Sequence, residues 1–327
     1  MSFSSAFPSI RVRRTARHRA PTRRPGPRRS AAVVLTSAVA AATVLGGPAR
    51  ADTPVALTGI AAYQPSLSPW YTPDQVDHCL GGNPDCVPVT ISRMDAVLGG
   101  LAASCDHRAP FTLAYLRTTQ QYQRAAATPG FFQDPTFVNV EDVFFASYFF
   151  NASDQWNAGS TSAVPRAWQV AFAAARNRDV SGLGDILLGM NAHINRDLPY
   201  VLAGLGLVAP DGSSRHEDHE RVNIFLNQVA AAMLDEAAAR FDPTINDLKS
   251  PYGITYTAFM QIIAVWREAA WLNAQRLVLA PTPGQRAAVE DSIEATSATL
   301  ATTLRTTLLY LPPQAYARDR YCATHHG

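Results

Sequence analysis

The sequence predicts an all-α protein, a single globular bundle of about seven or eight helices around a buried central helix at residues 182–208. Apolar side chains recur at the helical spacing of three and four residues from about residue 90 to 309. Convincing strand alternation of polar and apolar residues is absent. Hydrophobic residues make up 47% of the chain and charged residues only 17%, so we expect a large buried core.

The first 51 residues have the features of a secretory signal peptide. They contain ten arginines and no acidic residue, and they include the apolar run AAVVLTSAVAAATVL and the A-x-A pattern at 49–51. This order is typical of an export signal that is cleaved before Asp52. The arginine pair at 28–29 leaves the twin-arginine route open. The apolar run is shorter than the ~20 residues of a membrane span, so we expect a secreted protein with no stable span after cleavage.

Removal of this segment reverses the sign of the net charge. The whole chain has a formal charge of +2, whereas the 276 residues after position 51 carry 18 basic and 26 acidic side chains, a charge of −8. An acidic protein has no electrostatic footprint for a polyanion. We therefore expect no nucleic-acid partner.

Four cysteines follow the signal segment: Cys79, Cys86, Cys105 and Cys322. An even number in an exported chain indicates disulfides, and four cysteines allow three pairings. Cys79 and Cys86 flank the turn-rich sequence LGGNPD, which favours a local bond between them. The second bond would then join Cys105 to Cys322 and attach the C-terminal tail.

The mature chain divides into an irregular arm at 52–88, which carries the local disulfide, and a helical domain at 89–327. The arm is rich in proline and glycine and has few periodic apolar positions. In the helical domain, apolar spacing and Pro or Gly boundaries predict helices at about 91–101, 111–118, 135–148, 165–178, 182–208, 215–241, 254–279 and 285–309.

The central stretch 182–208 consists almost entirely of small and large aliphatic residues, as expected of a helix buried on all sides. Five polar residues interrupt it: Asn191, His193, Asn195, Arg196 and Asp197. Burial of such groups without partners costs roughly 2–7 kcal/mol each. Partners for them must therefore exist inside the fold.

His193 and Asp197 lie one helical turn apart on the same face, a spacing typical of two metal ligands or of an acid/base pair. Pro199 has no N–H to donate to the carbonyl of Asn195, so we expect the helix to kink or restart there. A structural alternative stays open. Asp197 could cap a second helix, and His193 could be a core histidine bonded to a backbone carbonyl.

Three further polar residues are expected to complete a site with His193 and Asp197. Asp218 and Asn223 lie near the start of the predicted helix 215–241, and Glu268 lies between two tryptophans in the next helix. The predicted catalytic residues are His193, Asp197 and Glu268. The predicted metal ligands are His193, Asp197, Asp218 and Asn223. Oxygen ligands with one imidazole suit a divalent metal, which could activate water.

His216 and Glu220 receive no role. The sequence His216-Glu-Asp-His219 differs from the H-E-x-x-H pattern of zinc proteases because only two residues separate its histidines. Acidic residues are favoured in the first turn of a helix, so Glu217 and Glu220 are interpreted as solvated groups at a helix entry.

Several segments together resemble an actinobacterial family catalogued as domain of unknown function 5995. They are FTLAYLRTT, FFQDPTFV followed by DVFFASYFF, GMNAHINRDLP, RVN at 221–223, and WREAAWLNAQRL, which extend from about residue 88 to 280. The family name implies no activity. A looser likeness is to all-helical, zinc-dependent phospholipases C, which carry His, Asp and Pro as at His193, Asp197 and Pro199. Those enzymes use further histidines, and here Val201 stands where one would be expected.

Three functions fit these observations. The first is a secreted, metal-assisted hydrolase that uses the His/Asp/Glu site. The second is a secreted binding protein for a lipid or another apolar small molecule, with an aromatic-lined cavity and polar residues that orient the ligand. The third is a structural envelope protein in which the polar cluster is a satisfied core network.

The exported protein should begin at Asp52. The arginine-rich segment, the apolar run and the small residues at 49 and 51 all favour cleavage at this position. An intact mass of the protein from culture medium measures the N-terminus directly. A mass that retains residues 30–51 would contradict cleavage and favour an anchor.

Overall fold

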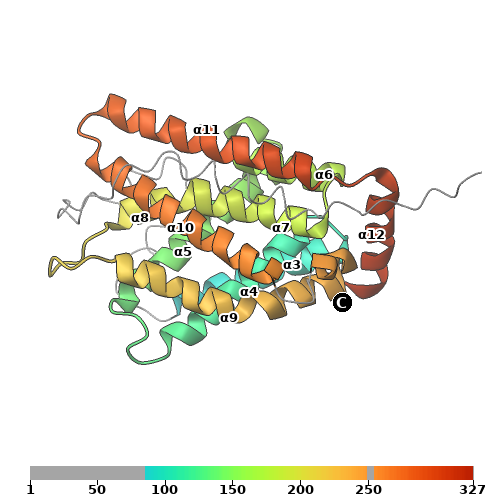
Figure 1. Ribbon diagram of the computed structural model, residues 1–327, viewed down its shortest axis with the longest axis horizontal. Coiled ribbons are helices and arrows are strands. Elements are labelled where there is room, and N and C mark those ends of the chain that lie inside the picture. Colours follow the sequence, from blue (N-terminus) through green and yellow to red (C-terminus); the bar gives the residue numbers. More distant parts are fainter. Residues whose placement is uncertain (1–84, 249–253, 327) are drawn as a thin grey trace, which may run out of the picture.

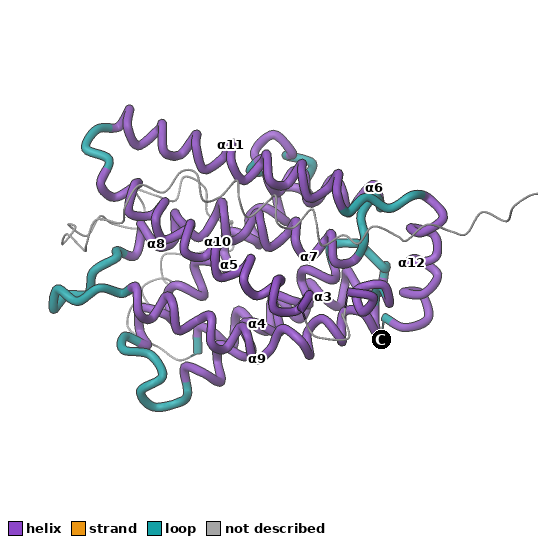
Figure 2. Tube along the Cα trace, in the orientation of Figure 1, coloured by secondary structure: helices purple, strands orange, loops and turns teal. Residues whose placement is uncertain are grey.

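The structure is a computed structural model that describes residues 85–248 and 254–326. Helices make up most of these residues (Figure 1). No strand element occurs within those two ranges (Figure 2), which confirms the all-α prediction. The α-helices are α3 (Cys86–Ala103), α4 (Ala109–Ala126), α5 (Pro135–Asn157), α6 (Arg166–Asn177), α7 (Gly182–Met190), α8 (Leu198–Leu205), α9 (His216–Arg240), α10 (Ile254–Leu279), α11 (Pro283–Thr307) and α12 (Pro312–His325). Three short segments join them: η3 (Thr161–Ala163), η4 (Asn191–Asp197) and η5 (Pro243–Leu248).

The predicted central helix is formed by α7, η4 and α8, which succeed one another without a break. It passes through the middle of the bundle, between α11 on one side and α9 with α4 on the other (Figure 1). Helices α4, α5, α6, α10 and α11 all contact it. It ends at Leu205 rather than at the predicted residue 208, because Gly206 has a φ of +90° that L-residues rarely adopt.

The helix changes its winding near the proline, as predicted, but over a longer segment. Helix α8 begins at Leu198, with Pro199 in its first turn. Before it, Asn191–Asp197 form a π-helix, and the N–H of Leu198 donates to the carbonyl of His193. A π turn accommodates one extra residue, turns the side chains out of the α-helical register and is frequent at functional sites. The candidate residues His193 and Asp197 both lie in this turn.

A glycine allows the central helix to approach α4 closely. A Cβ atom at Gly189 would lie 2.3 Å from Cγ of the Phe111 ring, far inside van der Waals contact. Phe111 in turn packs edge-on against Phe149 of α5 and Trp168 of α6. This aromatic contact fixes α4, α5 and α6 around one end of the π turn.

The boundary between the arm and the helical domain lies earlier than predicted. Residues 86–88, assigned to the irregular arm on the basis of the sequence, form the first turn of α3, and Cys86 and Val87 are buried. Cys86 is disulfide-bonded. Its predicted partner Cys79, the rest of the arm and the signal segment lie outside the described residues, so those predictions remain predictions.

The disulfide between Cys105 and Cys322 is confirmed. It attaches α12 to the residues directly after α3. Within α12, the buried Arg318 donates to Asp185 Oδ2 at 2.6 Å, and its side chain also bonds to the ring of His107 at 2.9 Å. Because both contacts are buried, they attach the C-terminal helix to the bundle independently of the covalent bond.

Helix α3 is long and apolar enough to cross a membrane, judged by its length and composition alone. Its residues Met94 and Leu98 are buried in the core, and the helix packs against α4 and α5. A core helix of a bundle has the same composition as a spanning helix. The absence of a stable membrane span therefore remains a prediction.

Candidate functional site

A partly enclosed cavity of about 90 Å³ lies between the central helix and helices α4, α5, α9 and α10. This volume has room for several water molecules or a small organic group. Most of its wall is apolar, formed by Phe111, Val138, Phe145, Met190, Ile194, Val222, Phe225, Leu226 and Ile263. The remainder is polar and contains Thr118, Tyr122, Tyr115, Glu141, Asp142, His193 and Arg267.

Five residues that line the cavity each have one buried polar atom without a hydrogen-bond partner among residues 85–248 and 254–326: Tyr115 Oη, Glu141 Oε2, Asp142 Oδ2, His193 Nε2 and Arg267 Nε. A buried polar group without a partner costs about 1–3 kcal/mol, and most native proteins contain few of them. Because all five belong to residues that line one cavity, a small rearrangement of these side chains would let a bound molecule or water satisfy them.

Asp197 orients His193. The ring atom Nδ1 lies 3.2 Å from Asp197 Oδ2, and this carboxylate also accepts hydrogen bonds from Trp168 Nε1 at 2.8 Å and from Arg196 at 3.0 Å. Since a carboxylate accepts, we assign the ring proton to Nδ1, which leaves Nε2 as an acceptor at the cavity. Burial lowers the pKa of His193, although Asp197 opposes this shift. The imidazole is therefore a neutral base.

Aromatic contacts hold the ring of His193 in place. Phe145 stacks on it with 3.4 Å between ring centroids and 5° between the planes, and Tyr115 lies edge-on at 4.5 Å. The structural alternative for this pair is wrong in both parts. The partner of His193 is a carboxylate rather than a backbone carbonyl, and Asp197 makes no capping hydrogen bond to α8.

Two neighbouring acids on α5 face the same cavity. Burial raises the pKa of Glu141 to about 7, against the opposing effect of Arg267. Burial, together with the charge of Glu141, raises the pKa of Asp142 well above its usual value. Both carboxyl groups can therefore hold a proton at pH values where exposed acids are ionised.

Arg267 of α10 is held against α9 by His219. Its guanidinium donates to the backbone carbonyl of His219 at 2.7 Å and lies 3.1 Å from His219 Nδ1. His219 Nε2 in turn lies 3.0 Å from the carbonyl of Arg267, to which it donates. Burial and the charge of Arg267 lower the pKa of His219 well below its usual value. The neutral ring can thus accept from Arg267 and donate to it.

The structure brings His193 and Asp197 together but separates them from the other three predicted residues. Asp218 accepts hydrogen bonds from the backbone N–H groups of residues 133 and 134, each at 2.7 Å, and so fixes the entry of α5. Asn223 lies 3.3 Å from a carboxylate oxygen of residue 220, and Glu268 pairs with residue 216. Within residues 85–248 and 254–326, none of the three bonds to His193 or Asp197, and none lines the cavity.

The prediction of one shared site is therefore corrected, and helix geometry explains the error. Successive residues of an α-helix point about 100° apart. Arg267 faces the cavity, so its neighbour Glu268 faces away from it. Sequence analysis also missed Tyr115, Glu141 and Arg267, for which the one available signal was the pair of acids at 141–142 inside an aromatic-rich segment.

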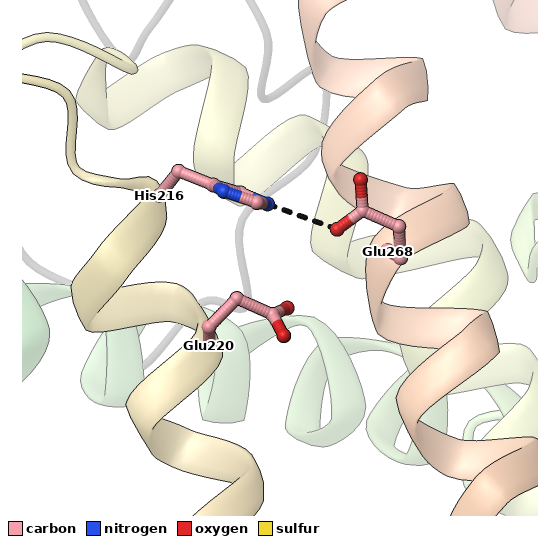
Figure 3. Close-up of side chains that lie close together, drawn as sticks. All are labelled: His216, Glu220 and Glu268. Atoms are coloured by element: carbon pink, nitrogen blue, oxygen red, sulfur yellow. Dashed lines mark hydrogen bonds and ion pairs between the residues drawn. The ribbon is translucent and has the colours of Figure 1, made fainter. Parts of the chain in front are cut away.

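A second group of side chains meets between α9 and α10. The ligand atoms of His216, Glu220 and Glu268 all lie within 4.8 Å of one another, and His216 Nε2 lies 2.9 Å from Glu268 Oε2 (Figure 3). One imidazole and two carboxylates are side chains that can hold a metal ion. The sequence signal for this group was the spacing of four residues between His216 and Glu220, which places both on one face of α9.

Comparison with known proteins gives one match. A family model described as a family of unknown function, DUF5995, matches residues 87–307, from α3 to α11. No curated protein and no solved structure matches the chain. The matched region contains every residue of the cavity wall and all three residues of the second group.

Replacement of Glu141 by Gln should stabilise the protein at pH 8 more than at pH 4.5. The native carboxyl group has a pKa of about 7, so it keeps its proton where the unfolded chain has lost it. Stability therefore falls between pH 4.5 and 7, by an amount on the order of 3 kcal/mol. Glu141→Gln removes this loss, and urea unfolding at the two pH values measures it.

The control for this substitution is Glu290→Gln on α11, which does not line the cavity. It should change stability equally at both pH values. An effect of Glu141→Gln that is the same at pH 4.5 and at pH 8 would contradict the assigned protonation of Glu141.

Proposed function

Because the chain belongs to the family of unknown function DUF5995, whose description names no activity, we propose a function from the cavity: the protein binds a small molecule with an apolar body and a hydrogen-bonding head. The observation that carries this proposal is that five residues lining one mainly apolar cavity each have a buried polar atom without a partner among the described residues. An apolar pocket with a few convergent polar groups is the usual form of a small-molecule site.

The chemistry of the wall favours a head that donates hydrogen bonds. Among the five unpartnered atoms, the carboxyl oxygens of Glu141 and Asp142 and the ring nitrogen of His193 can accept. Tyr115 Oη can accept or donate, and Arg267 Nε can only donate. An amine or a hydroxyl group matches this excess of acceptors. A protonated amine would also favour ionisation of the two acids, because an opposite charge lowers the pKa of a carboxyl group.

We also propose that the protein acts outside the cell. This part rests on the arginine-rich segment, the apolar run and the A-x-A pattern within residues 1–51. A secreted protein with this cavity would take up a lipid-like or other apolar molecule from its surroundings. The negative charge of the segment after residue 51 disfavours nucleic acid as a partner.

The first test compares four ligands of one shape and different heads: 2-phenylethylamine, 2-phenylethanol, ethylbenzene and phenylacetate. Calorimetric titration should give the tightest binding for the amine, and ethylbenzene should bind at least about tenfold more weakly, since a hydrogen bond to a charged group contributes about 1.5–3 kcal/mol. Glu141→Gln and Asp142→Asn should each reduce the preference for the amine.

The control is Asp291→Asn, an exposed carboxylate of α11 that does not line the cavity, and this variant should keep the preference. The proposal fails if no compound binds, or if ethylbenzene and phenylacetate bind as tightly as the amine. Failure of all four would favour the third function considered above, a structural envelope protein in which the polar groups serve only the fold.

A second candidate function is hydrolysis by acid/base catalysis. It rests on His193, whose Nδ1 is oriented by Asp197 and whose Nε2 is an unpartnered acceptor at the cavity. Nε2 would take a proton from water as the water attacks an ester carbonyl. Protonated Glu141 would give its proton to the departing alcohol oxygen. The metal-assisted form predicted from the sequence also needs Asp218, Asn223 and Glu268 beside His193, and they lie elsewhere.

Hydrolysis of ethyl butyrate across pH 5–9, followed by the release of butyrate, tests this candidate because an alkoxide leaving group needs a proton. Because the pKa of Glu141 is about 7, the rate should fall above that pH as the acid loses its proton. His193→Ala should abolish the rate, Glu141→Gln should lower it and remove the descending limb, and Asp291→Asn should change neither. An unchanged rate in His193→Ala would exclude this mechanism.

A further inference from the structure

The group between α9 and α10 combines side chains that bind metals with a fixed arrangement. His216 and Glu220 lie one turn apart at the start of α9, and Glu268 approaches them from α10 (Figure 3). The ring of His216 packs against Trp271 with 4.8 Å between centroids. This contact restricts the imidazole to an orientation in which Nε2 points to Glu268, at 2.9 Å.

The charges of the group favour the binding of a cation. Two carboxylates share the space with one imidazole, and in the described part of the chain no arginine or lysine forms an ion pair with Glu220 or Glu268. Arg267, the neighbour of Glu268 in the chain, interacts with the charge of Glu220, but its guanidinium hydrogen bonds go to His219 and not to either carboxylate. Among residues 85–248 and 254–326, the one other hydrogen bond that either carboxylate receives is a long one of 3.3 Å from Asn223 to Glu220. Like charges at this separation repel each other unless a cation lies between them.

We propose that His216 Nε2 and one carboxylate oxygen each from Glu220 and Glu268 bind a divalent transition metal, with zinc as the best fit. Imidazole is a poor ligand for calcium and magnesium, whereas zinc accepts imidazole and carboxylate together. Glu220 is exposed, so its side chain can turn toward the ion. Three protein ligands leave the fourth tetrahedral position to water.

The metal would join two helices that form one wall of the cavity. Helix α9 contributes Val222 and Phe225 to that wall, and helix α10 contributes Ile263 and Arg267. A bond between α9 and α10 through the ion therefore fixes the separation of these side chains. This proposal is independent of what the cavity binds.

The experiment is a calorimetric titration of the tag-free, chelator-treated full-length protein with zinc chloride, repeated with calcium chloride. Zinc should bind at one ion per chain and calcium should not bind. At a free zinc concentration about 100 times the Kd, the Tm should rise by about 5–10 °C. His216→Ala and Glu268→Gln should abolish binding, and Glu220→Gln should weaken it by at least about tenfold.

The matched control is His325→Ala, an exposed histidine of α12, which should bind zinc as the parent protein does. Without zinc, the three site variants should melt close to the parent, because their side chains lie at the surface; a variant that does not fold is replaced by His216→Gln or Glu268→Ala. A cobalt(II) absorption spectrum gives a second readout of the site. The proposal is overturned if the parent binds no zinc, if His216→Ala still binds it, or if calcium binds and zinc does not.

Discussion

The buried carboxylate of Asp197 is the interaction on which the arrangement of the bundle depends. It is fully inaccessible and accepts hydrogen bonds from Trp168 of α6, from His193 and from Arg196. Arg196 continues the network to Glu294 of α11 at 2.6 Å. One carboxylate thus connects the central helix directly to α6 and, through a guanidinium, to α11. Removal of a partner from such a buried ion network leaves an uncompensated charge.

The π turn places this network and the cavity on two sides of the same short segment. In a regular helix, residues 193 and 197 would continue the register of α7, but the extra residue in the turn shifts the register of α8. The ring of His193, which lies in this turn, has Asp197 at one nitrogen and lines the cavity. The same short segment thus supplies both the structural carboxylate and the imidazole.

The parts of the fold and site that could be predicted from the sequence are those set by local spacing or by covalent chemistry. The pair of His193 and Asp197 depends only on a separation of four residues, and the bond from Cys105 to Cys322 is the one left once a local partner is assigned to Cys86. Whether a residue on another helix belongs to the site depends on which face of that helix meets the core. An apolar stripe identifies that face only to within one residue, and successive residues of an α-helix point about 100° apart around the helix axis. The choice of Glu268 in place of Arg267 is an error of this size.

Because of the bond between Cys105 and Cys322, the oxidation state of Cys105 depends on whether α12 is present. Cys322 lies in the last described helix of the sequence, so Cys105 keeps a free thiol until synthesis has passed α11 and reached the end of α12. A chain cut short before α12, or one that has not reached an oxidising compartment, retains this thiol. Reaction of Cys105 with a thiol-specific reagent would therefore distinguish chains that lack α12 or have not been oxidised from chains that carry the bond.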